Sequence, residues 1–170
     1  MTNQQIAAND LPSIASVDLM PISRAYLNIM FLNAIIYFSF PFIFLLVFFF
    51  FLEPDADSLY FWLFLSLLVL AFISYCTMAY LGFSKRRYAL RAHDIIYTKG
   101  LLFYKLTTVP FVRIQHIEIS KSFIARKFNL ATLHIFTAGE AGTDLVIKGL
   151  PNDTAEKLNA FLSSKINEQP

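Results

Sequence analysis

Two long apolar runs constrain what this chain can fold into more than any other feature of its sequence. Residues 27–52 and 59–83 contain no charged side chain, and residues 53–58 between them read Glu-Pro-Asp-Ala-Asp-Ser. An α-helix rises about 1.5 Å per residue, so roughly 20 apolar residues cross the hydrocarbon core of a bilayer. Two core helices of a small soluble domain are the alternative, but each would need a polar face, and neither run has one. We therefore predict a two-span transmembrane hairpin over residues 27–83.

The charges that flank the hairpin predict its orientation. Arg24 precedes the first run, and the cluster Lys85, Arg86, Arg87 and Arg91 follows the second, whereas the loop 53–58 contains three acidic side chains and no Lys or Arg. Lys and Arg collect on the cytoplasmic side of membrane proteins. We expect both termini to be cytoplasmic. The first run begins too late and is too long for a cleaved signal peptide, so we interpret it as a retained anchor.

Two residues of the first run, Asn33 and Pro41, are expected to affect how the helix bends and packs. Pro41 removes a helical donor and predicts a kink near residues 37–41. Asn33 is expected to pack against Ser66, Ser74 or Cys76 of the second run, or against another subunit. A transport site is the alternative, but neither run contains Asp, Glu, Lys, Arg or His. Cys76 is the only cysteine, which excludes an intrachain disulfide and a cysteine-based metal site.

The chain from residue 84 to residue 170 changes from helical to alternating patterning and predicts one small domain. Strands are expected over residues 87–92, 95–98, 101–109, 114–120, 131–137 and 143–150, a short basic helix over 121–128, and a C-terminal helix after Pro151. The apolar stripe of that last helix comprises Ala155, Leu158, Phe161, Leu162 and Ile166. The predicted fold class is α+β, with a small antiparallel sheet or partial barrel and the helix covering one end or face. Residues 1–26 form a separate N-terminal cytoplasmic segment, in which 11–24 lies along the membrane interface or forms an irregular leader.

Three residues of this region predict particular backbone geometry. Gly100 is expected at positive φ in a turn after the second strand. Pro110 must lie at a sheet edge, a bend or a strand end, because it cannot donate to a strand ladder. Asn129 follows the short basic helix, where a left-handed residue is expected.

Three short motifs in the C-terminal half resemble those of a known protein family. Residues 109–119 read Val-Pro-Phe-Val-Arg-Ile-Gln-His-Ile-Glu-Ile, residues 129–133 read Asn-Leu-Ala-Thr-Leu, and residues 137–139 read Thr-Ala-Gly. With two spans before them, they resemble the bacterial pleckstrin-homology-like membrane proteins of the YdbS type, in which a glycine usually stands where this chain has Asn129. The resemblance covers residues 27 to about 166. It implies a pleckstrin-homology-like domain anchored in the bacterial inner membrane as a multi-pass protein, and it implies no activity.

Cations of the C-terminal half form the first candidate site. From residue 84 onward there are 13 Lys and Arg against 7 Asp and Glu, a difference of +6. Anionic cytoplasmic lipid is the expected counter-charge, and each cation near it contributes about 1 kcal/mol. The candidate lipid-facing set is Lys85, Arg86, Arg87, Arg91, Lys121, Arg126 and Lys127. For residues 85–87 the alternative is a role in topology alone. No nucleic acid is expected, because the cations are dispersed and form no basic arm.

The motif residues Arg113, Gln115 and His116 form the second candidate site. They predict either a recognition surface or, for Arg113, hydrogen bonds to backbone carbonyls at a sheet edge. His116, His134 and Glu118 are too few and too irregularly spaced to predict a metal site. No serine lies in a nucleophile elbow, and residues 138–142 lack the ending of a phosphate loop. We therefore expect neither an enzyme nor a cofactor.

These observations favour a non-enzymatic, membrane-anchored interaction module. Its expected partners are the lipid bilayer and either another membrane protein or further copies of this chain. One alternative is a sensor of anionic lipid or of envelope stress. Another is an accessory subunit of a membrane transporter that uses Asn33 and Pro41 in a shared interface.

Overall fold

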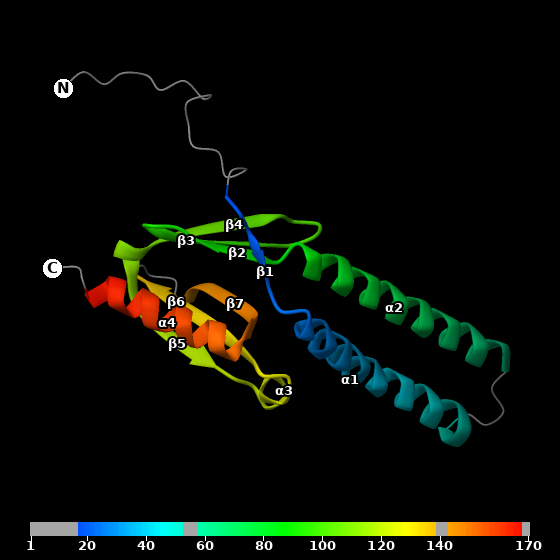
Figure 1. The fold of residues 1–170 in the computed structure, drawn as a ribbon. Coiled ribbons are helices and arrows are strands. Elements are labelled where there is room, and N and C mark those ends of the chain that lie inside the picture. The colour runs from blue at the N-terminus through cyan, green and yellow to red at the C-terminus, as the bar shows by residue number, and fades with distance from the viewer. Residues whose placement is uncertain (1–16, 53–57, 139–142, 168–170) are drawn as a thin grey trace, which may run out of the picture.

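The structure is a computed structural model that describes residues 17–52, 58–138 and 143–167 (Figure 1). A helical hairpin extends from one end of a small α+β domain. The hairpin consists of α1 (Ala25–Val47), a π-helical turn η3 (Phe48–Leu52) and α2 (Ser58–Ser84). Apart from Ser58, the predicted acidic loop lies outside the described residues.

Both helices of the hairpin are long and apolar enough to cross a membrane, over Ala25–Phe51 and Leu59–Ser84. Almost none of their residues are buried within the chain; Phe40, for example, is 77% exposed. A core helix of a soluble protein would be mostly buried. The helices contact each other through edge-on aromatic rings, with centroids 5.3 Å apart for Phe38 and Phe72 and 5.5 Å for Phe49 and Phe61. The exposed surface therefore needs an apolar environment outside the chain.

The domain contains two antiparallel sheets and a C-terminal helix, which confirms the predicted fold class. The first sheet has the order β1 (Met20–Pro21), β2 (Arg87–Leu90), β3 (Asp94–Lys99) and β4 (Lys105–Pro110). The second has the order β5 (Ile114–Ser120), β6 (Leu130–Thr137) and β7 (Thr143–Pro151). The short helices η4 (Phe111–Arg113) and α3 (Phe123–Lys127) precede and follow β5, and α4 (Asn152–Asn167) ends the fold.

One hydrophobic core lies between the two sheets and α4. Ile95, Leu133, Ile135 and Ile147 are fully buried at its centre. The predicted stripe of α4 closes the core through the buried side chains of Ala155, Leu158 and Leu162, whereas Phe161 is 38% exposed and packs edge-on against Phe111. The buried residues of β6 alternate along the strand, those of α4 recur at helical spacing, and β3 is buried over Ile95–Thr98, so all three elements contribute to one core.

The segment directly before α1 belongs to the first sheet. Met20 pairs with Tyr88 and Pro21 pairs with Arg87, so β1 extends the sheet beyond β2. Proline is tolerated there because β1 is an edge strand. Ile22 is only 3% exposed within the main core. Over residues 17–24 the chain is thus part of the domain, while residues 1–16 lie outside the described residues.

The strand expected from Leu101 begins four residues later, at Lys105. Lys99 pairs with Lys105, so residues 100–104 form the loop of a hairpin and have no partner strand. Gly100 adopts φ +100°, as expected, and a Cβ there would lie 2.0 Å from the carbonyl oxygen of Phe103. The prediction of a strand over residues 101–104 was wrong, because the tight return of the chain at Gly100 leaves these apolar residues outside the ladder.

The other two backbone predictions are confirmed. Asn129 adopts φ +53° directly after α3. Pro110 is the last residue of β4, which lies at the free edge of the first sheet, and the chain turns there into η4.

Candidate functional site

The joint between α1 and the domain fixes how the domain sits on the hairpin. Gly149 of β7 adopts φ +80°, and a Cβ there would lie 2.6 Å from Cγ of Tyr26, so the tyrosine ring lies directly on the glycine. One turn later, Ile29 is buried together with Ala125 of α3 and Leu130 of β6. The N–H of Ser23 donates to the carbonyl of Gly149 at 2.9 Å. The start of α1 is therefore embedded in the domain.

Asn33 lies on the side of α1 that faces the domain. It lines a cavity of about 290 Å³ whose other polar lining residues include Ser120, Ser122, His134 and Lys148. Of the partners expected for Asn33 (Ser66, Ser74, Cys76 or another subunit), Ser66 donates its hydroxyl within its own helix, to the Leu63 carbonyl 2.8 Å away. A serine in a helix can satisfy its hydroxyl in this way without a partner helix.

Pro41 lies further along α1, where it faces α2. The helix continues through Pro41 to Val47. Pro41, Phe44 and Phe48 of this stretch line one wall of an apolar groove of about 500 Å³ between the helices, and Phe64 and Leu67 line the other.

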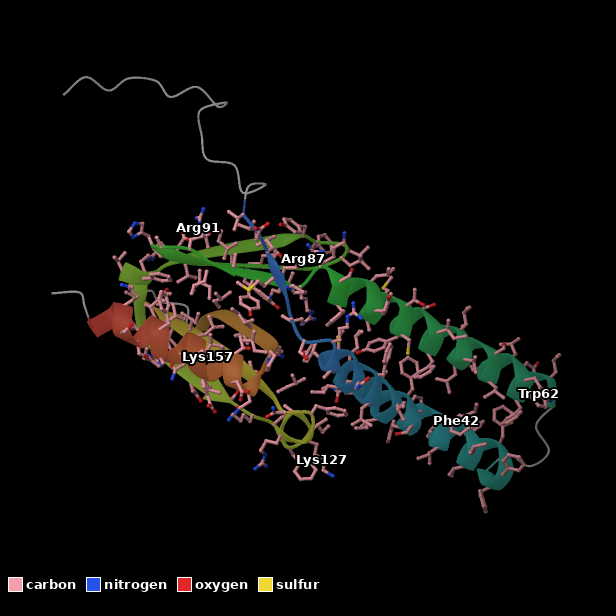
Figure 2. All side chains as sticks on the ribbon, in the orientation of Figure 1. Phe42, Trp62, Arg87, Arg91, Lys127 and Lys157 are labelled. Carbon is pink, nitrogen blue, oxygen red and sulfur yellow. The ribbon has the colours of Figure 1, made fainter. Side chains whose placement is uncertain are left out.

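The seven cations proposed to face lipid divide into three groups. Lys85, Arg86 and Arg87 lie where α2 passes into β2, and Figure 2 shows Arg87 next to the end of α2. The guanidinium of Arg86 lies 5.5 Å from the ring centroid of Tyr26. The buried hydroxyl of Thr98 donates to the carbonyl of Lys85 at 3.2 Å. This first group is part of the joint between hairpin and domain.

The second group of cations surrounds α3, which contacts the start of α1. The Ser122 hydroxyl caps α3 by accepting from the N–H of Ala125 at 3.2 Å. Cζ of Arg126 lies 6.0 Å and Nζ of Lys127 lies 5.2 Å from the ring centroid of Phe123. The Phe123 side chain is 67% exposed. Within the described part of the chain, neither cation forms an ion pair.

Lys121 belongs to the same region but its charge is partly compensated. Its Nζ lies 3.3 Å from Oε1 of Glu156 on α4. Hydrogen bonds from Lys121 and then from Asn152 lower the pKa of Glu156. Lys121 therefore links β5 to α4, which leaves Arg126 and Lys127 as the outward cations of this region.

Arg91 is separated from both groups. It follows the far end of β2, and Figure 2 shows it well away from the hairpin. Its Nε donates to Oδ1 of Asp94 at 2.6 Å, and its Nη2 donates to Oδ2 of the same carboxylate. This bidentate ion pair spans the turn between β2 and β3. The structure does not bring Arg91 together with the cations of α3.

The motif residues lie at the end of the domain opposite the hairpin, where β4 ends and β5 begins (Figure 1). An NH2 group of Arg113 lies 3.4 Å from the Ala138 carbonyl, which favours the structural role expected for this residue. Gln115 occupies a bulge of β5 and is exposed, and His116 stacks on Phe136 with centroids 4.1 Å apart. Val112 beside them is 73% exposed. We refer to Val112, Arg113, Gln115 and His116 as the distal edge.

The remaining histidine that was considered for metal binding has a partner of its own. Nε2 of His134 lies 2.8 Å from the Ser120 hydroxyl. Among residues 17–52, 58–138 and 143–167, no three His, Cys, Asp or Glu side chains lie close enough together to hold a metal ion.

The sequence interpretation missed one apolar surface close to the hairpin. Leu102, Phe103 and Tyr104 are 74%, 88% and 63% exposed in the loop between β3 and β4. An apolar groove of about 440 Å³ separates this loop from the last turns of α2. The signal in the sequence is the run of four apolar residues after Gly100, which does not alternate as a half-buried strand does.

Comparisons with known proteins agree with the fold. Residues 38–166 match the family model described as Bacterial PH domain. The chain is also 32% identical over 77 residues to the UPF0699 transmembrane protein YdbS of Bacillus subtilis (strain 168). That alignment covers 45% of this chain and 46% of YdbS, so it spans about half of the relative's length. No solved structure matches the chain. Because the family model covers most of the chain, including α2 and the six strands from β2 to β7, this protein belongs to the bacterial PH domain family.

Proposed function

We propose that this protein is a non-enzymatic interaction module of the bacterial cytoplasmic membrane. Its hairpin crosses the bilayer twice, and its domain presents the distal edge to a partner membrane protein on the cytoplasmic side. The observation that carries the proposal is the joint, in which Ile22, Tyr26 and Ile29 are packed into the domain. A domain built onto a membrane helix has a fixed orientation, so its distal edge always points the same way relative to the hairpin, which a flexible tether would not ensure.

Charge and similarity support the membrane orientation. Lys85, Arg86 and Arg87 follow the domain-side end of α2, whereas residues 53–57 at the other end of the hairpin contain three acidic side chains and no cation. This asymmetry favours a cytoplasmic domain and cytoplasmic termini. The relative YdbS is named as a transmembrane protein.

The distal edge has the composition of a contact surface. Val112 offers an exposed apolar side chain, and Arg113 and Gln115 lie beside it as polar neighbours. Interfaces combine such apolar centres with polar rims, and arginine is enriched in them. Because this edge lies opposite the hairpin, it faces away from the bilayer in the proposed orientation.

A photo-crosslinking side chain at position 112 tests the proposal in native membranes. We expect a discrete crosslinked product from residue 112 that weakens when Gln115→Ala, a change at an exposed residue of the same edge, is added. Lys157, exposed on α4, provides a matched position from which no such product should form. A protein that gives no crosslink at residue 112 and stays monomeric in mild detergent would contradict the proposal.

A lipid sensor is the second candidate, and the exposed Phe123 with Arg126 and Lys127 is the observation that favours it. The full chain is needed for the test, because a fragment that starts at Ser84 lacks Ile22 and β1. If the domain senses anionic lipid, the thermal stability of the protein in nanodiscs should rise with anionic lipid content. Replacing both Arg126 and Lys127 by Gln should then remove that rise.

An accessory role in a transporter has less support. Asn33, which this reading placed in an interface between membrane helices, lines a cavity with residues of the domain. Pro41 does line a groove between the two membrane helices, but all the side chains that line this groove are apolar.

A further inference from the structure

We infer that two apolar tips of the domain insert into the interfacial layer of the leaflet from which the hairpin emerges. The first tip is the loop of Leu102, Phe103 and Tyr104, and the second is Phe123 of α3. The partner is the lipid bilayer itself. This inference goes beyond the proposed partner surface, because it concerns the opposite end of the domain.

The length of the helices places the membrane boundary beside these tips. α1 and η3 together run from Ala25 to Leu52, and α2 runs from Ser58 to Ser84. Each helix exceeds the roughly 20 residues needed to cross the hydrocarbon core by about two turns. In α1 the excess lies on the domain side, since Tyr26 and Ile29 are covered by the domain. About 20 residues counted back from Leu52 reach Asn33, so the hydrocarbon core begins near Asn33 of α1. About 20 residues counted forward from Ser58 reach Thr77, so the same boundary lies near Thr77 of α2.

The first tip lies at the level of α2 where that boundary falls. The groove beneath the loop is lined by Met78, Ala79 and Gly82 of α2 and by Leu102 and Phe103 of the loop. Arg86 is the charged residue among its lining. An apolar groove with a cation at its edge fits an acyl chain below an anionic headgroup, and in water it would remain an uncovered apolar surface.

The second tip lies on the other side of the hairpin, next to α1. α3 contacts α1 through the cluster of Ala125 with Ile29. On its outer side Phe123 is exposed and flanked by Arg126 and Lys127, and Figure 2 shows Lys127 pointing away from the domain. An aromatic ring with neighbouring cations is the pattern of residues that anchor proteins at the membrane interface.

Exposure alone does not distinguish these two tips from other exposed apolar residues, because Val112 of the distal edge is exposed to a similar degree. Position distinguishes them. Leu102, Phe103 and Phe123 lie on elements that contact or adjoin the two helices, whereas Val112 lies at the opposite end of the domain. The domain would thus contact the membrane through the two helices and the two tips, all at the same end of the domain.

Tryptophan fluorescence of the full chain in lipid nanodiscs tests the inference. Trp62 is the only tryptophan, so Trp62→Phe gives a silent background. Single tryptophans are then introduced by Phe103→Trp, Phe123→Trp and, as the matched exposed control, Val112→Trp. We expect blue-shifted emission and strong quenching by lipids brominated in their acyl chains for positions 103 and 123. Position 112 should emit at longer wavelength and be quenched by aqueous acrylamide instead.

The same quenching measurement on the unmodified chain tests the proposed membrane anchor independently of the two tips. Trp62 lies in α2 near the far end of the hairpin and should be quenched by brominated lipid if the hairpin spans the bilayer. Quenching of Trp62 together with acrylamide-accessible tryptophans at 103 and 123 would overturn the inference and leave the anchor intact. That same result would leave the tips free for a protein partner.

Discussion

Gly149 lies directly against the Tyr26 ring at the start of the first helix. Its φ of +80° disfavours any side chain, and a Cβ would meet the Tyr26 ring at 2.6 Å. We expect Gly149→Ala to lower the free energy of unfolding by about 2–4 kcal/mol, through overpacking and left-handed strain together. Thermal unfolding in mild detergent measures this change. Gly82→Ala is the matched control, because no atom lies within 4 Å of a Cβ there and alanine favours a helix; its stability should not fall.

Tyr97 makes the stability of the domain sensitive to alkaline pH. Burial raises the pKa of its phenol above the usual value near 10, and the nearby Arg86 opposes this effect only in part. A raised pKa in the folded state means that the contribution to stability is complete below the unfolded pKa and is lost as pH rises beyond it. The free energy of unfolding should therefore fall above about pH 10.

Tyr97→Phe removes the titrating group while keeping the ring in the core. We expect the variant to lose less stability than the unmodified chain between neutral and strongly alkaline pH. Tyr88→Phe should act in the same direction, because burial raises the pKa of Tyr88 as well. Denaturant midpoints of the unmodified chain and the two variants, measured across this pH range, test the expectation. It would be contradicted if the midpoints of all three proteins fell equally with rising pH.

At the scale of elements, the short strand β1 carries more of the fold than its two residues suggest. It brings Ile22, which is 3% exposed, into the main core. We expect Ile22→Ala to cost about 2–4 kcal/mol of stability, as truncation of a buried isoleucine does. Met20→Ala, at a residue that is 50% exposed in the same strand, should cost about 0.5 kcal/mol or less. Equal losses for the two variants would show that the strand does not anchor the start of α1.

The elements that the sequence predicts well are those with a strong period or a special backbone residue. The two apolar helices, α4 and the left-handed Asn129 belong to this class. β1 could not be predicted, because two residues carry no period and their pairing with β2 bridges more than 60 residues of chain. The loop 101–104 was mistaken for a strand, because apolar residues that face lipid or solvent resemble apolar residues that face a core.

The arrangement of the candidate site residues in space could not be predicted from the sequence, because it depends on long-range packing. Periodicity placed Asn33 within a helix but did not reveal that the domain lies beside that helix. Charge identified Arg91 and Arg126 as one set, although β2 carries Arg91 to the far end of the domain and α3 holds Arg126 near α1. Only the folded chain separates the end near the hairpin from the distal edge.

At the scale of the whole molecule, the fold has two chemically different ends. The end at the hairpin carries aromatic tips and cations: exposed Phe103 lines the groove beside α2, and exposed Phe123 lies on α3, which contacts α1. The distal edge carries Val112 with polar neighbours and lies where β4 passes into β5. Because α1 is embedded in the domain, these two ends cannot exchange places relative to the membrane. The orientation of the hairpin therefore decides which compartment the distal edge can reach.

A labelling experiment on the intact molecule tests that orientation. Cys76 is the only cysteine, so Cys76→Ala allows a single thiol to be placed at Val112→Cys or, in the loop between the spans, at Ala56→Cys. We expect a membrane-impermeant maleimide to label position 56 but not position 112 in intact cells, and to label position 112 in inside-out vesicles. The cations at the domain side of α2 and the acidic loop predict this pattern. If position 112 reacted in intact cells, the distal edge would face outward, and any partner would have to be sought outside the cytoplasm.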